Sequence, residues 1–128
     1  MGQPELQPHR YTADDYFALE EKAETRHEFL EGEVFAMAGE SLAHNIIVQN
    51  FVLTLRPGLR GKGCQVAIET VQLAVEANRR YTYPDIVVSC DSQDQHEHRR
   101  LHHPVLIVEV LSPSTEAYDR GLKFNQYK

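Results

Sequence analysis

The sequence predicts a mixed α/β (α+β) fold in which helices pack against one mixed sheet. Two runs rich in β-branched and aromatic residues, at positions 81–90 and 105–111, have the composition of buried strands. Segments with helical spacing surround them, in the order helix, hairpin, helix, several strands, helix. A length of 128 residues, with 41% hydrophobic and 25% charged residues, is typical of one globular domain. We therefore expect residues 1–128 to form a single domain.

The first predicted elements are an arm, a short helix and a hairpin. Residues 1–10 contain proline and are expected to form a flexible arm. Thr12 has the hydroxyl of a helix N-cap, and acidic residues follow it, so a helix is expected to run to about Glu21. Residues 27–38 have Gly32 in their middle, which predicts two strands joined by a tight turn.

A longer helix is predicted next. Ser41 is its expected N-cap, and we expect the helix to end before Pro57. Apolar residues recur along it at three- and four-residue intervals, which predicts a helix packed on a core. These residues are Leu42, Ile46, Ile47, Phe51, Leu53 and Leu55.

The second half of the chain is predicted to be mainly strands. Residues 64–76 alternate like a single half-buried strand, and residues 91–103 are polar and aperiodic like an exposed loop. Helical spacing continues from residue 119 to the end of the chain. The sequence stops inside this helix, so we expect it to be a fragment of a longer domain or a shortened member of its family.

Composition restricts the cellular setting and the partners. No run approaches the roughly 18 apolar residues that span a bilayer, and residues 1–10 lack the features of a signal peptide. These features predict a cytoplasmic protein without membrane contact. The formal net charge of −6 has the wrong sign for binding nucleic acid by net charge alone, so such a role requires a local site.

The two cysteines, Cys64 and Cys90, are too few and too far apart for a disulfide framework or a four-ligand zinc site. Each lies beside a β-branched strand pattern. We therefore expect both to be small buried hydrophobic residues.

Two carboxylates interrupt the apolar strands. Glu109 lies within residues 105–111, and Asp85 follows Pro84 in the neighbouring run. Adjacent buried carboxylates repel each other unless a cation lies between them, and Mg²⁺ typically takes one or two protein carboxylates. The alternative is that Asp85 accepts backbone hydrogen bonds at a strand irregularity while Glu109 lies in water at the end of the sheet.

Lys123 is a third candidate. If its helix folds back over the preceding strand, Lys123 can reach Glu109 and stabilise charge developing on a phosphate. The alternative is an ordinary surface pair with Asp119, four residues earlier.

Three segments together resemble a known family. They are residues 83–85 (Tyr-Pro-Asp), 107–115 (Ile-Val-Glu-Val-Leu-Ser-Pro-Ser-Thr) and 119–123 (Asp-Arg-Gly-Leu-Lys). They are similar to the PD-(D/E)XK restriction-endonuclease superfamily and, more narrowly, to the Uma-type family of bacterial endonucleases. Residues 11–16, residues 27–33 and His44 also match that family's pattern, so the resemblance covers essentially the whole chain.

The resemblance implies a restriction-endonuclease-like αβββαβ core and metal-dependent phosphodiester hydrolysis. Asp85 and Glu109 would be the first and second metal-binding acids, and the carbonyl of Val110 would complete the metal shell. The superfamily's lysine lies two residues after the second acid, where this chain has Leu111, so Lys123 would replace it. The superfamily core ends in a strand after the last helix, which this chain lacks.

Other polar residues are given simpler interpretations. The loop histidines are expected to be solvated rather than to bind zinc or nickel, although with the neighbouring arginines they could meet phosphates; they are His96, His98, His102 and His103. His44 could face the site, but a lone helix histidine is more often structural. Glu28 and Glu33 are possible further carboxylates that we leave out of the predicted site. No phosphate-binding glycine loop is present, so no nucleotide cofactor is expected.

Three hypotheses follow. The first is a Mg²⁺- or Mn²⁺-dependent endonuclease that acts on DNA, with Asp85, Glu109 and Lys123 as catalytic residues. The second is a nuclease-fold module without catalysis that binds nucleic acid or a protein partner. The third is a fragment that folds only as a homodimer, by pairing its exposed sheet edge.

Overall fold

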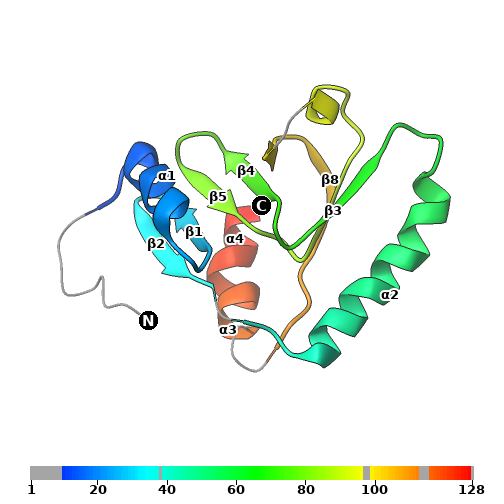
Figure 1. Ribbon diagram of the computed structural model, residues 1–128, viewed down its shortest axis with the longest axis horizontal. Coiled ribbons are helices and arrows are strands. Elements are labelled where there is room, and N and C mark those ends of the chain that lie inside the picture. Colours follow the sequence, from blue (N-terminus) through cyan, green and yellow to red (C-terminus); the bar gives the residue numbers. More distant parts are fainter. Residues whose placement is uncertain (1–9, 38, 97–98, 113–115, 128) are drawn as a thin grey trace.

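The structure is a computed structural model that describes residues 10–37, 39–96, 99–112 and 116–127. The strands form two sheets, with α1 (Ala13–Lys22) at one side of the molecule and α2 (Leu42–Leu59) at the other. The C-terminal helices lie between these two sides (Figure 1). This mixed arrangement of helices and strands confirms the predicted α+β fold class, but the strands divide between two sheets instead of the single sheet that the sequence predicts.

The N-terminal elements are close to their predicted positions. Thr12 caps α1: its hydroxyl accepts a hydrogen bond from the Asp15 amide at 3.1 Å, and the Asp15 carboxylate accepts one from the Thr12 amide at 3.0 Å. The hairpin consists of β1 (His27–Leu30) and β2 (Glu33–Ala36). Both turn residues between them, Glu31 and Gly32, have positive φ, as a tight two-residue hairpin turn requires.

The larger sheet has five strands in the order β2-β1-β5-β4-β7. It is mixed, because β4 (Gln72–Glu76) pairs in parallel with β7 (Arg100–Leu101), whereas β5 (Arg80–Thr82) and the hairpin pair antiparallel. Tyr16 attaches α1 to this sheet. Its ring stacks on Phe29 with centroids 5.1 Å apart, and its hydroxyl donates to the carbonyl of His27 at 2.6 Å.

The smaller sheet contains β3 (Gln65–Ile68), β6 (Ile86–Ser89) and β8 (Pro104–Val108), all antiparallel. In its register Ile86 lies opposite Val108. Because Asp85 precedes Ile86 and Glu109 follows Val108, the antiparallel pairing brings both acids to the same end of the sheet.

The prediction of one strand over residues 64–76 is wrong. The chain leaves β3 at Glu69, which has a φ of 46°, and enters β4 in the other sheet. The residue types alternate in polarity through the break, but burial does not, because Gln72, Leu73 and Ala74 at the start of β4 are all buried. A left-handed residue between them is invisible to such a pattern.

The expected packing of α2 on a core is also wrong. Its buried residues among those described are His44 and Val48, and Leu42 and Leu53 are 74% and 69% exposed. Ile46, Ile47 and Phe51 are exposed as well. The helix also continues past Pro57 to Leu59. Periodic spacing indicates a helix with an apolar face, but it does not show that another element covers that face.

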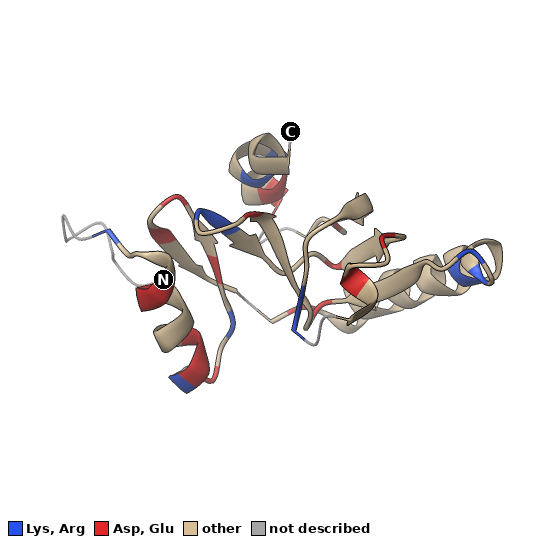
Figure 2. Cartoon of the chain, turned by 90° about the horizontal axis from the view of Figure 1, so that it is seen from above, with Lys and Arg blue, Asp and Glu red and all other residues tan. Residues whose placement is uncertain are grey.

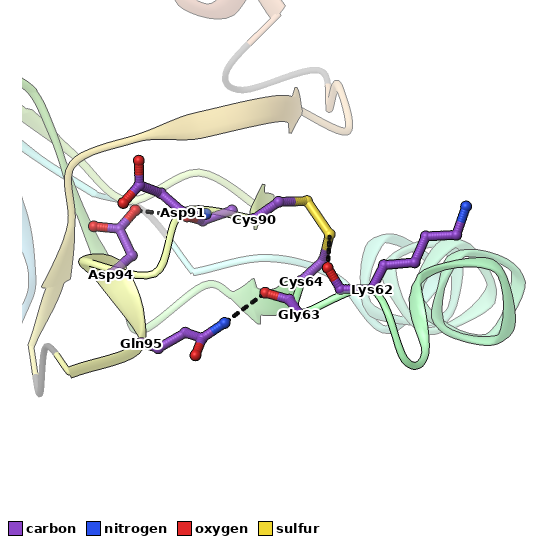
Figure 3. The surroundings of a disulfide bond; sticks show 8 residues. Lys62, Gly63, Cys64, Cys90, Asp91, Asp94 and Gln95 are labelled. Atoms are coloured by element: carbon purple, nitrogen blue, oxygen red, sulfur yellow. Dashed lines mark hydrogen bonds between the residues drawn. A yellow bond between two sulfur atoms is a disulfide. The ribbon is translucent and has the colours of Figure 1, made fainter.

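The cysteine prediction is wrong too. Cys64 and Cys90 form a disulfide, and neither is buried (Figure 3). The cause is the register of the small sheet, in which Gln65 pairs with Ser89, so that the residues just outside this pair lie opposite each other.

Residues 91–103 are more ordered than the predicted loop. They contain a short helix, η2 (Asp94–His96), and the strand β7. The Asp94 carboxylate is buried and accepts hydrogen bonds from the Ser89 hydroxyl and from the amides of His102 and His103. His98 lies outside the described residues.

The C-terminal segment is helical, as predicted. It comprises α3 (Glu116–Tyr118), the wider π-turn η3 (Asp119–Lys123) and α4 (Phe124–Tyr127). Nowhere in the described parts of the chain is a helix both long and apolar enough to cross a membrane.

Candidate metal centre

The two predicted acids lie next to each other. The Asp85 amide donates to Glu109 Oε1 over 3.4 Å, which brings the backbone of the first acid to the side chain of the second. Both side chains are 14% exposed. The alternative that placed Glu109 in water at the end of the sheet is therefore wrong.

The Asp85 carboxylate is turned toward α2. Its Oδ2 accepts a hydrogen bond from the Val110 amide at 2.6 Å and lies 3.1 Å from His44 Nε2. The same imidazole nitrogen lies 3.1 Å from the Val110 carbonyl oxygen. Asp85 thus accepts a backbone hydrogen bond, as the alternative interpretation expected, and also faces a side chain that could bind a cation.

His44 lies in the first turn of α2, where its amide donates to the capping Ser41 hydroxyl at 3.1 Å. Its side chain is buried, and its Nδ1 has no hydrogen-bond partner among the described residues. The closest charged group on that side is Glu69 Oε2, at 3.9 Å. His44, Glu69 and Asp85 each offer one ligand atom within 4.8 Å of the other two.

Glu109 faces the C-terminal helices. Its Oε2 accepts from Lys123 Nζ at 2.6 Å and from the Tyr127 hydroxyl at 2.8 Å. Burial raises the pKa of Glu109 to about 7, although Lys123 and Tyr127 both act to lower it.

Lys123 lies between two carboxylates. Its Nζ is 2.8 Å from Glu28 Oε2 on β1, in addition to its contact with Glu109. Burial disfavours the ammonium, but the two carboxylates outweigh this effect and raise the pKa of Lys123. The surface-pair interpretation of Lys123 is wrong, because its side chain is 3% exposed.

Glu28 was left out of the predicted site, yet it is one of the most buried acids. It also accepts hydrogen bonds from the Tyr83 amide at 2.8 Å and from the Tyr118 hydroxyl at 2.7 Å. Burial and the negative charge of Glu28 raise the pKa of Tyr118, so this hydroxyl stays a donor. Glu33, the other acid left out, is exposed on β2.

The signals that could have identified the missed residues are weak. Glu28 lies in a strand that is buried on both faces. In the sequence, however, it looks like an ordinary charged residue of a hairpin. Glu69 lies in a turn, where charged residues are common. These side chains differ from surface residues only in the tertiary structure. There, β1, the turn after β3 and the start of α2 pack around Asp85 and Glu109.

The site as a whole is negative. Four carboxyl groups, from Glu28, Glu69, Asp85 and Glu109, surround one ammonium group, that of Lys123. Figure 2 shows basic residues gathered at the far end of α2, away from its first turn where His44 lies. The local charge and the oxygen donors therefore suit a cation rather than an anion.

The fold is shared with a solved protein. The chain superposes with a TM-score of 0.69 on the crystal structure of a "putative nuclease belonging to DUF820" from Anabaena variabilis, at 21% sequence identity. The match covers 88% of this chain and 66% of that one. The chain therefore has the same fold as that protein.

Sequence comparison gives the family. Residues 13–128 match the Uma2 family, described as "Putative restriction endonuclease". The chain belongs to this family, which confirms the resemblance seen in its motifs.

Two curated relatives come from Synechocystis sp. The protein slr1290 is 36% identical over 97% of this chain, and sll1609 is 29% identical over 91% of it. The aligned parts cover 63% and 67% of those two proteins. The chain thus spans about two thirds of the length of these relatives.

Proposed function

We propose that the protein is a Mg²⁺- or Mn²⁺-dependent endonuclease that hydrolyses phosphodiester bonds in DNA. The observation that carries the proposal is the adjacency of Asp85 and Glu109, which flank the paired strands β6 and β8, with the ammonium of Lys123 on the second acid. A restriction-endonuclease family supplies the reaction class. The DNA substrate is inferred from the family, and the metal is inferred from the residues of the site.

The donor set fits a divalent cation. The carboxylates of Asp85 and Glu109 and the carbonyl of Val110 are the oxygen ligands that Mg²⁺ and Mn²⁺ prefer. The negative charge of the site also exceeds what Lys123 neutralises. When bound, such a cation would supply Lewis-acid stabilisation of the phosphate and a more acidic water.

The protein's own groups have separate roles in this proposal. The hydrogen bond from the Val110 amide holds the Asp85 carboxylate in one orientation, and the Tyr127 hydroxyl does the same for Glu109. Lys123 is held by Glu28 and Glu109, so its positive charge stays in the site, where it can stabilise negative charge on a phosphate. Glu28 is in this view a positioning residue.

DNA cleavage tests the proposal. We expect supercoiled plasmid or single-stranded DNA to be cut when Mg²⁺ or Mn²⁺ is added, and not in EDTA. Asp85→Asn and Glu109→Gln, which keep side-chain size, should each lower cleavage by at least about 100-fold. Glu33→Gln, a matched change at an exposed acid, should leave it unchanged. Full cleavage by both site variants would contradict the assignment.

A second function is favoured by one observation. Lys123 is already paired with two carboxylates, which leaves it little charge to offer a phosphate. The protein would then be a nuclease-fold module that binds nucleic acid or a protein partner without catalysis. DNA binding in EDTA by the wild type, with no cleavage of any substrate in Mg²⁺ or Mn²⁺, would support this alternative.

A further inference from the structure

The imidazole of His44 is incompletely satisfied. Its Nε2 lies 3.1 Å from two oxygens, Asp85 Oδ2 and the Val110 carbonyl oxygen. A single N–H at Nε2 cannot be directed fully at both of them. Nδ1 is buried and has no hydrogen-bond partner among the described residues. Buried polar atoms of this kind usually have a partner, so the ring has capacity for one more interaction than the described residues supply.

The spacing of these atoms is that of metal ligands. Two donors at right angles on an octahedral ion, each 2.0–2.1 Å from it, lie about 3.0 Å apart. His44 Nε2 has this separation from both Asp85 Oδ2 and the Val110 oxygen. The three atoms come from the start of α2, the start of β6 and the end of β8, so the tertiary structure, and not local sequence, brings them together.

Glu69 completes the arrangement on the other side of the ring. Its Oε2 lies 3.9 Å from His44 Nδ1, and its amide donates to the carbonyls of Pro84 and Asp85, both at 3.2 Å. The backbone of Glu69 is therefore attached to the segment that carries Asp85. Histidines that bind a metal usually donate their other N–H to a carboxylate or a carbonyl, which fixes the tautomer and the orientation of the ring.

We propose that His44 is a direct ligand of the divalent cation, through Nε2, and that Glu69 orients its ring through Nδ1–H. The inference rests on the proposed function, because the cation is the one shared with Asp85 and Val110. It adds a nitrogen donor to a set of oxygen donors. Both Mg²⁺ and Mn²⁺ accept oxygen ligands, but of the two only Mn²⁺ is a first-row transition metal, the class of ion that imidazole nitrogen binds well. The site therefore selects Mn²⁺ over Mg²⁺.

The test is Mn²⁺ binding to the full chain, followed by electron paramagnetic resonance. The loss of the free Mn²⁺ signal gives the affinity, and pulsed spectra of the bound ion report coupling to ligand ¹⁴N. We expect ¹⁴N coupling in the wild type, its replacement by ¹⁵N coupling after labelling with ¹⁵N-histidine, and Mn²⁺ bound at least about tenfold more tightly than Mg²⁺ in competition.

Three variants separate the roles. His44→Gln should lose the nitrogen coupling and most of the preference for Mn²⁺. Glu69→Gln should keep the coupling while the affinity falls about 10- to 100-fold, as for other outer partners of metal-binding histidines. His103→Gln, which changes an exposed histidine that contacts Gln93, should behave like the wild type. Circular dichroism checks that each variant is folded.

The outcomes distinguish this inference from the proposed function. Bound Mn²⁺ without histidine nitrogen coupling in the wild type overturns the role of His44, even if His44→Gln fails to fold. If Asp85→Asn also abolishes binding in that case, the oxygen-ligated endonuclease site stands. Cleavage with Mg²⁺ but no binding of Mn²⁺ likewise overturns only the inference. The absence of both metal binding and cleavage removes the proposed function as well.

Discussion

Lys123 and Glu28 form a buried ion pair between the C-terminal helical segment and the first strand. Their side chains are 3% and 1% exposed, and Nζ lies 2.8 Å from Oε2. Glu109 shares the same ammonium at 2.6 Å. This cluster connects the N-terminal hairpin with the C-terminal helices, so it has a structural role in addition to any role in catalysis.

Removing the lysine of this ion pair should destabilise the protein strongly. We expect Lys123→Met to lower the free energy of unfolding by about 3–5 kcal/mol, because it leaves two buried carboxylates without their partner. The double change Lys123→Met with Glu28→Gln should restore part of the loss, since one of those charges is then absent. Urea unfolding measures both. Equal stability of the single and double variants would contradict the expected relief of the unpaired charge.

The folding stability of the protein should fall at acid pH because Asp94 becomes protonated. Burial acts to raise the pKa of this carboxyl, but hydrogen bonds from the Ser89 hydroxyl and from the amides of His102 and His103 outweigh it and lower the pKa below its usual value. A lowered pKa means that Asp94 stabilises the fold above its unfolded-state pKa, and that the contribution is lost as pH falls through the folded-state value. Asp94→Asn should therefore have lower stability at neutral pH and a flatter acid limb.

The measurement is the midpoint of thermal unfolding from pH 7 down to pH 3. Asp91→Asn is the matched control, because Asp91 lies at the start of the same segment and is less buried. An acid limb as steep in Asp94→Asn as in the wild type would contradict the assignment of this stability to Asp94.

The disulfide should contribute measurably to stability. Cys64 and Cys90 enclose a loop with a sequence separation of 26, for which restriction of the unfolded chain corresponds to about 3 kcal/mol. We expect a reducing agent to lower the urea midpoint of the wild type. The double variant Cys64→Ala, Cys90→Ala should already be less stable and should not respond to the reductant. Two free thiols in protein purified without a reductant would contradict the bond.

Substitutions on the buried and exposed faces of α2 should differ in their effect on stability. Val48 is 1% exposed, so Val48→Ala should cost about 2 kcal/mol through lost burial and a cavity. Leu53 is 69% exposed, so Leu53→Glu should change monomer stability by less than about 0.5 kcal/mol.

The wild type and Leu53→Glu together test the predicted homodimer, by light scattering over a range of concentrations. If the wild type is a dimer and Leu53→Glu is a monomer, the exposed face of α2 is the interface. If both dimerise equally, the contact lies elsewhere, as the predicted pairing of sheet edges requires. Strictly monomeric behaviour of the wild type would contradict the homodimer prediction.

The site residues differ in how far sequence alone could identify them. Asp85 and Glu109 stand out because each is a lone charge in an apolar strand, and burying such a charge is costly enough to imply a function. Lys123 was proposed from helix geometry, and its contact with Glu109 confirms that geometric prediction. Glu28, Glu69 and His44 lie in contexts where charged and polar residues are common, so hydrophobic periodicity does not single them out; Glu28 and His44 match the family pattern, but that match alone did not place them in the predicted site.

By itself the sequence determined the fold class and the family, and it predicted Asp85 and Glu109 as the acids of the site. These follow from composition, from local hydrophobic periodicity and from the motif around Glu109, all of which are properties of neighbouring residues. The tertiary structure decided the rest. It divided residues 64–76 between two sheets, left the apolar face of α2 exposed, joined Cys64 to Cys90 and placed His44 beside Asp85. Each of these outcomes depends on strand register and on packing between distant segments, and periodicity along the chain carries no information about either.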